Sequence, residues 1–144
     1  MPKPPHFSQT YKFSCVPTCL KMVLAALGVE KSEAELRSLC ECDETGTSPS
    51  NAVKAAVDCG FDAYKANLIF EELEDLISQG ITPIVFTRVF ESSIYSHAVV
   101  VYKISKEKVF ILDPETGERK LDKNAFVEIW SRGLTIIVEN LMKS

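Results

Sequence analysis

Apolar residues recur at helical spacing through the first part of the chain. Pro17 suits the first turn of a helix, where a missing backbone N–H is not needed, and Gly28 fits the position just after a helix end. The sequence therefore predicts a helix that starts near residues 16–17 and ends before Gly28, with apolar positions at Val16, Leu20, Val23, Leu24 and Leu27.

Three further helices are expected, and capping residues mark the start of two of them. Ser32 followed by Glu35 is a capping box, and the pair Ser48-Pro49 is a typical helix start. Glycines follow the last two of these apolar patterns, as expected at helix ends. The three helices are expected at about residues 33–40, from Ser48-Pro49 to Gly60, and at Phe70–Gln79.

Strand patterns dominate the rest of the chain, because short runs rich in Val, Ile and Phe alternate with polar turns. The turn Ser105–Lys108 predicts a hairpin, Pro114–Gly117 predicts a second turn, and Asp122 is expected to cap a short helix through Trp130. Helices come first and strands follow, which predicts an α+β fold with a mainly antiparallel sheet. Its strands are expected at Phe61–Leu68, Pro83–Val89, His97–Ile104, Val109–Asp113 and Leu134–Leu141.

Length and composition indicate one globular unit. The chain has 144 residues, enough for a real core, and its 46% hydrophobic and 25% charged residues argue against disorder. The sequence shows no internal repeat, low-complexity tract or linker. Residues 1–144 are therefore expected to form a single domain, with residues 1–8 as a flexible tail.

Charge and hydropathy exclude several classes of protein. The net charge of −4 provides no basic surface for nucleic acid. No apolar run reaches the length of about 20 residues that a membrane span needs, and the N-terminus lacks the apolar core of a signal peptide. We therefore expect no nucleic-acid partner, no transmembrane segment and a cytoplasmic location.

The cysteines do not resemble a disulfide framework or a metal site. Their number is five, and an odd count without a signal peptide argues against paired disulfides. Cys15 and Cys19 are four positions apart, and one residue separates Cys40 from Cys42, whereas common structural zinc sites have two residues between paired cysteines. We expect no metal and no other cofactor.

Cys15 is the first candidate for chemistry. It lies at the predicted start of the first helix, where free N–H groups and the helix dipole favour the nucleophilic thiolate form. The alternative is that Cys15 is a small buried apolar residue, which is the commonest role of a free cysteine. Its position alone does not decide between the two.

Three other residues complete a candidate site. His97 begins an apolar strand and can pair with a thiolate and protonate a leaving group, whereas His6 lies in a Pro-rich tail and is a weaker candidate. Across the hairpin, Asp113 is expected within a register step or two of His97, where it would hold the ring by Nδ1–H. The amide of Gln9 and the backbone N–H of Cys15 are expected to face an oxyanion.

Each of these residues also has an ordinary structural interpretation. His97 would be a strand-edge histidine bonded to a backbone carbonyl, and Asp113 would be the first residue of a turn. Gln9 alone would be an unremarkable surface residue. The combination of all four favours the chemical interpretation.

The order Gln9, Cys15, His97 in "HAVVV" and Asp113 in "LDPETG" resembles the papain-like cysteine peptidases, most closely peptidase family C39. These bacteriocin-processing peptidases often form the N-terminal cytosolic domain of ABC exporters and cleave leader peptides after a double glycine. The resemblance runs from Gln9 to about Val138. It implies that Cys15 is the nucleophile, His97 the general base and acid, Asp113 the orienting residue and Gln9 the oxyanion donor.

The chain departs from the family at one point. It has Ser14-Cys15-Val16 where the family usually has Asp-Cys-Gly, so Val16 is expected at the mouth of the cleft. Tyr95 and Ser96, in an expected loop over Phe90–Ser96 before the histidine, are further candidates for substrate binding.

The resemblance implies hydrolysis of a peptide or protein substrate. That substrate is either a leader peptide, with an ABC exporter as partner, or another peptide that is cut by a free-standing relative of the family. Two alternatives stay open from the residues alone. The domain would bind a peptide without efficient cleavage, or it would use the same thioester for acyl transfer or deamidation.

Overall fold

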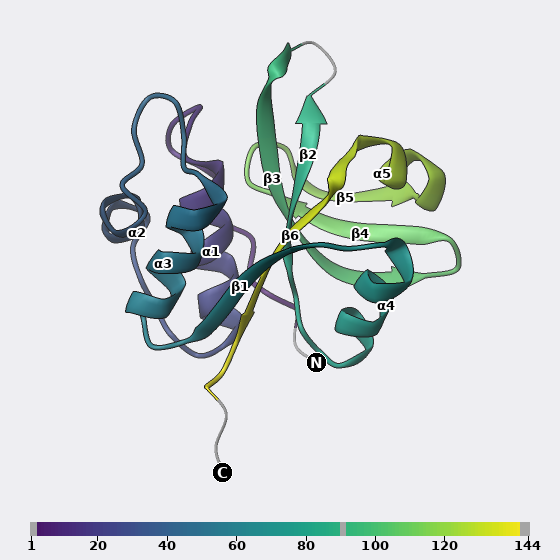
Figure 1. The fold of residues 1–144 in the computed structure, drawn as a ribbon, viewed down its shortest axis with the longest axis horizontal. Coiled ribbons are helices and arrows are strands. Elements are labelled where there is room, and N and C mark those ends of the chain that lie inside the picture. The colour runs from purple at the N-terminus through teal and green to yellow at the C-terminus, as the bar shows by residue number, and fades with distance from the viewer. Residues whose placement is uncertain (1–2, 90–91, 142–144) are drawn as a thin grey trace.

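The computed structural model describes residues 3–89 and 92–141, with side chains apart from those of residues 89–96. Three helices come first along the chain and lie together on one side of a sheet (Figure 1). They are α1 (Cys15–Ala26), α2 (Glu33–Leu39) and α3 (Pro49–Asp58). All three predicted helices are confirmed, with boundaries shifted by one or two residues.

The helix boundaries follow the expected local chemistry. The capping box is reciprocal, because Ser32 Oγ accepts from Glu35 N at 3.0 Å while Glu35 Oε1 accepts from Ser32 N at 3.1 Å. Ser48 Oγ likewise accepts from Asn51 N at 3.1 Å. Gly28 follows the C-cap of α1 with φ +91°, a conformation that glycine adopts without strain.

The sheet has six antiparallel strands in the order β1-β6-β2-β3-β4-β5. Two further helices lie between strands along the chain. The elements are β1 (Asp62–Asn67), α4 (Phe70–Ser78), β2 (Ile84–Val89), β3 (Ser92–Ser105), β4 (Lys108–Asp113), β5 (Gly117–Asp122), α5 (Lys123–Ile129) and β6 (Trp130–Glu139). The predicted α+β class with an antiparallel sheet is confirmed.

Helices cover both faces of this sheet (Figure 1). One core packs Leu20 of α1 against Ile84 and Val100, and a second packs Phe126 of α5 against Val85 and Val99. Successive strand residues alternate between the two cores, because side chains of a strand point alternately to opposite faces. Burial on both faces explains why the central strands are continuously apolar.

Several predicted boundaries were wrong. The strand β5 was missed, because its charged sequence lies at the sheet edge and pairs with β4 alone. β6 begins at Trp130 instead of Leu134, and β3 begins at Ser92, so the expected loop before His97 is strand from that residue. Asp122 occupies the N-cap of α5 but makes no capping bond, because its carboxylate pairs with Lys108.

Among the described residues, no helix combines the length and apolar character needed to cross a membrane.

Candidate active site

Cys15 is the first residue of α1, the helix that packs against β3. The preceding residue, Ser14, is fully buried, and its hydroxyl bonds back to Tyr11 O at 3.0 Å. Cys15 retains 9% exposure, so its thiol borders both core and solvent. The predicted location of this cysteine at a helix N-terminus is confirmed.

His97 and Asp113 come together from neighbouring strands. Asp113 follows Leu112, which pairs with Val100, and His97 lies three residues before Val100. This offset of two residues places the side chains within reach, and His97 Nε2 lies 2.7 Å from Asp113 Oδ1. The ring therefore bonds a carboxylate and not the backbone carbonyl of the ordinary interpretation.

The His97 ring contacts Asp113 through a different nitrogen from the one that we predicted. We expected Nδ1–H to face Asp113, but Nε2 does so. The Cys15 side chain is near enough to the ring to help raise its pKa. Because an imidazole has two nitrogens, Nδ1 is the one available to the thiol.

The turn after β4 holds the carboxylate of Asp113 in place. Its Oδ1 also accepts from the backbone N–H groups of Glu115 at 2.8 Å and Thr116 at 3.3 Å. On the other side, Arg119 Nη1 lies 3.7 Å from Oδ2. Asp113 thus starts a turn, as its ordinary interpretation predicted, and at the same time fixes His97.

The pKa values follow from these contacts. Burial by itself would lower the pKa of His97, but the bonds to Asp113 and Cys15, with the charges of both groups, raise that pKa to about 10. Burial would likewise raise the pKa of Asp113, yet the hydrogen bond and charge of His97 and the Glu115 N–H lower it to about 2. The pair is therefore an imidazolium and a carboxylate at neutral pH.

Gln9 is bonded to the turn after β4 and to Tyr11. Its backbone N–H donates to Pro114 O at 2.8 Å, and its Nε2 donates to Tyr11 O at 2.7 Å. Within residues 3–89 and 92–141, its buried Oε1 has no hydrogen-bond partner. One of the two amide N–H groups of Nε2 is thus used, which leaves the second for another acceptor.

The N-terminal segment reaches the same loop, a contact that sequence analysis missed. His6 Nε2 donates to the backbone carbonyl of Asp113 at 2.7 Å, and Phe7 packs against the core under the sheet. No local pattern in the Pro-rich tail signals this contact. The expected flexibility of residues 1–8 and the expected single domain over residues 1–144 stay predictions.

The three candidate substrate contacts fare differently. Val16 is 3% exposed and packs in the core with Leu20. Its side chain therefore has a packing role and does not lie at the mouth of the cleft, where we expected it. The physical reason is that position 16 faces inward on α1. The side chains of Tyr95 and Ser96 and all of Phe90 lie outside the described residues, so their substrate role stays a prediction.

The other cysteines differ chemically from a nucleophile. Burial raises the pKa of the Cys19 thiol well above its usual range and the pKa of Cys40 to about 12, so both stay protonated at neutral pH. Across the described ranges, no three His, Cys, Asp or Glu side chains are arranged to hold a metal ion.

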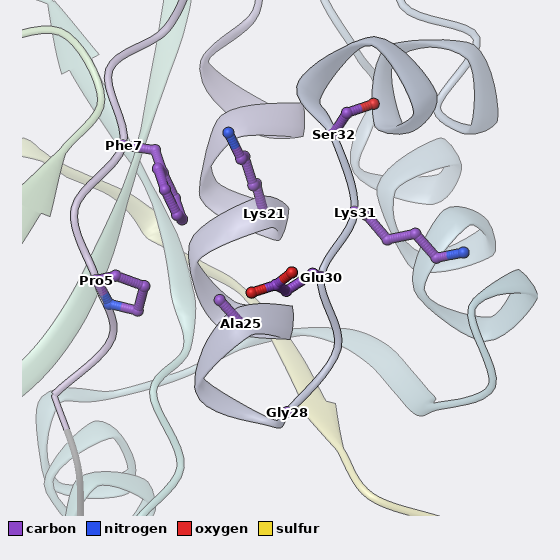
Figure 2. Close-up of a pocket in the computed structure, with 8 residues that line it drawn as sticks. All are labelled: Pro5, Phe7, Lys21, Ala25, Gly28, Glu30, Lys31 and Ser32. Carbon is purple, nitrogen blue, oxygen red and sulfur yellow. The ribbon is translucent and has the colours of Figure 1, made fainter.

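A groove of about 670 Å³ lies away from this cluster (Figure 2). It is lined by Phe7 and Lys21, and farther along by Ala25 and Gly28 at the C-terminal end of α1. Cys15 lies at the opposite end of that helix. The groove therefore does not contain the thiol, and the thiol–imidazole–carboxylate geometry marks the candidate site.

A family model and several known proteins match most of this chain. A model of the Peptidase C39 family matches residues 3–142. An uncharacterized protein of Methanothermobacter marburgensis is 31% identical over 131 residues, which cover 91% of this chain and 85% of that protein. The mesentericin-Y105 transport/processing ATP-binding protein MesD of Leuconostoc mesenteroides is 31% identical over 92% of this chain, but the match spans 18% of MesD.

Solved structures show the same architecture. The peptidase domain of Streptococcus ComA, a bi-functional ABC transporter, has a TM-score of 0.86 and 25% identity, covering 96% of this chain and 99% of that one. A double glycine motif protease from an AMS/PCAT transporter, in complex with the leader peptide, has a TM-score of 0.80 and 25% identity, covering 96% and 92%. This chain therefore belongs to the peptidase C39 family and has the papain-like fold of its peptidase domains.

Proposed function

We propose that this chain is a cysteine peptidase that hydrolyses a peptide bond through a thioester. Cys15 is the nucleophile, His97 the general acid and base, Asp113 the orienting residue and Gln9 the oxyanion donor. One observation carries the proposal: the His97 ring bonds Asp113 through Nε2 at 2.7 Å, and Cys15 is one of the groups that raise the pKa of this ring.

In the first half of the reaction, the Cys15 sulfur attacks the carbonyl carbon of the substrate. The carbonyl oxygen becomes an oxyanion, for which the backbone N–H of Cys15 and the remaining N–H of Gln9 Nε2 are donors. The imidazolium of His97, whose pKa is raised to about 10, then gives its proton to the leaving amine. The C–N bond breaks and a thioester to Cys15 remains.

In the second half, water hydrolyses the thioester. Acylation blocks the sulfur of Cys15, which is one of the groups that raise the pKa of His97. The pKa of His97 then falls, so the ring stays neutral after it has given up its proton and can take one from the attacking water. The C–S bond breaks, and the peptide acid is released. Asp113 keeps the ring in place through both steps, because its carboxylate is also held by the Glu115 N–H.

We further propose a peptide substrate that resembles a double-glycine leader. Support comes from the relatives: MesD is described as a transport/processing protein, and the similar AMS/PCAT protease was solved with a leader peptide. An ABC exporter as partner and a cytoplasmic location stay predictions from the sequence.

The proposal is tested with a peptidyl acyloxymethyl ketone ending in Gly-Gly, a reagent that traps a nucleophilic thiol. We expect it to label Cys15 in the wild type and to give no label in Cys15→Ala, with the labelled residue located by mass spectrometry. Labelling that is undiminished in Cys15→Ala would contradict the assignment.

A second measurement separates hydrolysis from the alternatives. A Gly-Gly-aminomethylcoumarin peptide should release coumarin and yield the free peptide acid. Release that requires an added amine would favour acyl transfer, and binding without release would favour a peptide-binding domain.

A further inference from the structure

The proposed reaction does not use one buried carboxylate, which lies beside the first turn of α1. Glu33, the first residue of α2, is 8% exposed. Its Oε1 lies 3.0 Å from both the backbone N and the Oγ1 of Thr10, and 3.2 Å from Thr18 Oγ1. Burial of a charge is costly unless it is paired and hydrogen-bonded. Oε1 has these partners, whereas the buried Oε2 has no hydrogen-bond partner among the described residues.

This one oxygen joins the two segments that form the oxyanion side of the site. Thr10 directly follows Gln9, the proposed oxyanion donor. Thr18 lies in the first turn of α1, and its hydroxyl also lies 2.8 Å from Ser14 O, next to Cys15. Glu33 therefore connects the residue after Gln9 with the helix turn that carries the nucleophile.

Arg37 adds a second connection from the same helix. Its Nε lies 3.4 Å from Glu33 Oε2, without hydrogen-bond geometry, and its guanidinium lies 4.7 Å from the centre of the Tyr11 ring. Tyr11 O in turn accepts from Gln9 Nε2 at 2.7 Å. On the opposite side Gln9 N is bound to Pro114 O, so the segment is held from both the turn after β4 and α2.

We propose that Glu33 is a positioning residue, which holds Gln9 through Thr10 at the distance from Cys15 that oxyanion stabilisation requires. This role rests on the proposed peptidase function. Bonds from neutral donors to a carboxylate are about twice as strong as bonds between neutral groups. An amide at position 33 would therefore hold Thr10 more weakly and would lose the charge that pairs with Arg37.

Weaker positioning of Gln9 should affect two reactions of the Cys15 thiol differently. Acylation by a peptide passes through an oxyanion, and a misplaced donor slows it. Alkylation by iodoacetamide displaces iodide and forms no oxyanion. A change at Glu33 should therefore affect the first reaction and not the second, whereas damage to the Cys15–His97 pair would affect both.

The experiment compares Glu33→Gln with Glu30→Gln, an exposed glutamate three residues earlier that undergoes the same change of charge. The probes are coumarin release from a Gly-Gly-aminomethylcoumarin peptide and iodoacetamide alkylation of Cys15. For Glu33→Gln we expect kcat to fall about 10- to 100-fold, with KM and the pH profile of alkylation unchanged. Glu30→Gln should match the wild type in both reactions.

Coupling to Gln9 is tested in the same assay. In a Gln9→Ala background, Glu33→Gln should cause little further loss, because the group that it positions is already absent. A full additional loss in that background, or an equal loss of alkylation, would overturn the positioning role while leaving the proposed peptidase function intact. A wild type that neither releases coumarin nor reacts faster with iodoacetamide than an ordinary thiol would overturn both.

If Glu33→Gln does not fold, Thr10 provides the same test. Thr10→Val removes the hydroxyl that donates to Glu33 but keeps its approximate shape, and Thr10→Ser restores the donor. Slower acylation in Thr10→Val that recovers in Thr10→Ser would support the role, and equal rates in all three proteins would overturn it.

Discussion

His97 Nε2 and Asp113 Oδ1 lie 2.7 Å apart, although 16 positions separate the two residues in the chain. The side chain of Asp113 is 5% exposed and that of His97 is 17% exposed, so water screens this contact poorly. Both strands that carry the pair are inside the sheet and are paired on both sides. The orientation of the imidazole toward Cys15 is therefore set by the sheet.

Iodoacetamide alkylation tests the pairing of Cys15 with His97. An imidazolium next to the sulfur favours the thiolate, so we expect Cys15 to react well below pH 8 and His97→Ala to lose this low-pH reactivity. The rate of Cys15 modification is measured from pH 5 to 9 by peptide mass mapping.

The same samples contain an internal control for this experiment. Cys19 and Cys40 have raised thiol pKa values and should stay unmodified while the fold is intact. Slow alkylation of Cys15 with the same pH dependence in both proteins would contradict the pairing and favour a binding domain.

Asp113→Asn should lower the pKa of His97. Burial favours the neutral ring, and without the carboxylate its effect is opposed mainly by Cys15. We expect the pKa to fall from about 10 toward the ordinary value of about 6.5. Proton–nitrogen NMR of the histidine rings measures it, and an unchanged value for His97 would show that Asp113 is not the main partner.

The raised pKa of His97 also predicts how stability depends on pH. The folded pKa of about 10 exceeds the unfolded value of 6.5, so this contribution is fully present below pH 6.5 and is lost as the pH rises toward 10. Urea unfolding at pH 6.5 and pH 10 should show a larger loss of unfolding free energy in the wild type than in His97→Ala. Equal losses in the two proteins would argue against a protonated ring.

Gln9→Ala tests the oxyanion donor separately from the nucleophile. Loss of one such donor typically lowers kcat by about 10²–10³-fold, and we expect an effect of this size on coumarin release with little change in alkylation by iodoacetamide. Ser8→Ala, an exposed neighbour, serves as the matched control. A Gln9→Ala enzyme with normal kcat would remove Gln9 from the proposed mechanism.

Gly133→Ala should destabilise the fold. Gly133 has φ +68°, and an added Cβ would lie 2.0 Å from Leu68 O, which is backbone and unable to move aside easily. Gly60→Ala has a similar positive φ, +96°, but its Cβ would meet nothing within 4 Å.

Urea unfolding separates the two causes of instability in these glycine variants. The free energy of unfolding should fall by about 1–2 kcal/mol in Gly60→Ala because of backbone strain. In Gly133→Ala it should fall by about 3 kcal/mol or more, because a steric clash adds to that strain. Equal losses would show that the approach of Leu68 does not matter.

Local sequence signals determined much of this protein. The capping box of Ser32 and Glu35, the stop at Gly28 and the turn after Ser105 act between residues close in the chain, so their patterns predict the structure directly. The order of Gln9, Cys15, His97 and Asp113 was likewise sufficient to indicate the family that the comparisons show. The hairpin length alone placed His97 near Asp113.

Tertiary structure decided what depends on packing between distant segments. The charged strand β5 exists because β4 offers it a partner, and Val16 faces the core because of the way α1 lies on the sheet. The choice of Nε2 for Asp113 and the bond from Thr10 to Glu33 depend on side-chain positions from separate elements. Hydrophobic period and capping chemistry report on one element at a time, so they carry no information about these contacts.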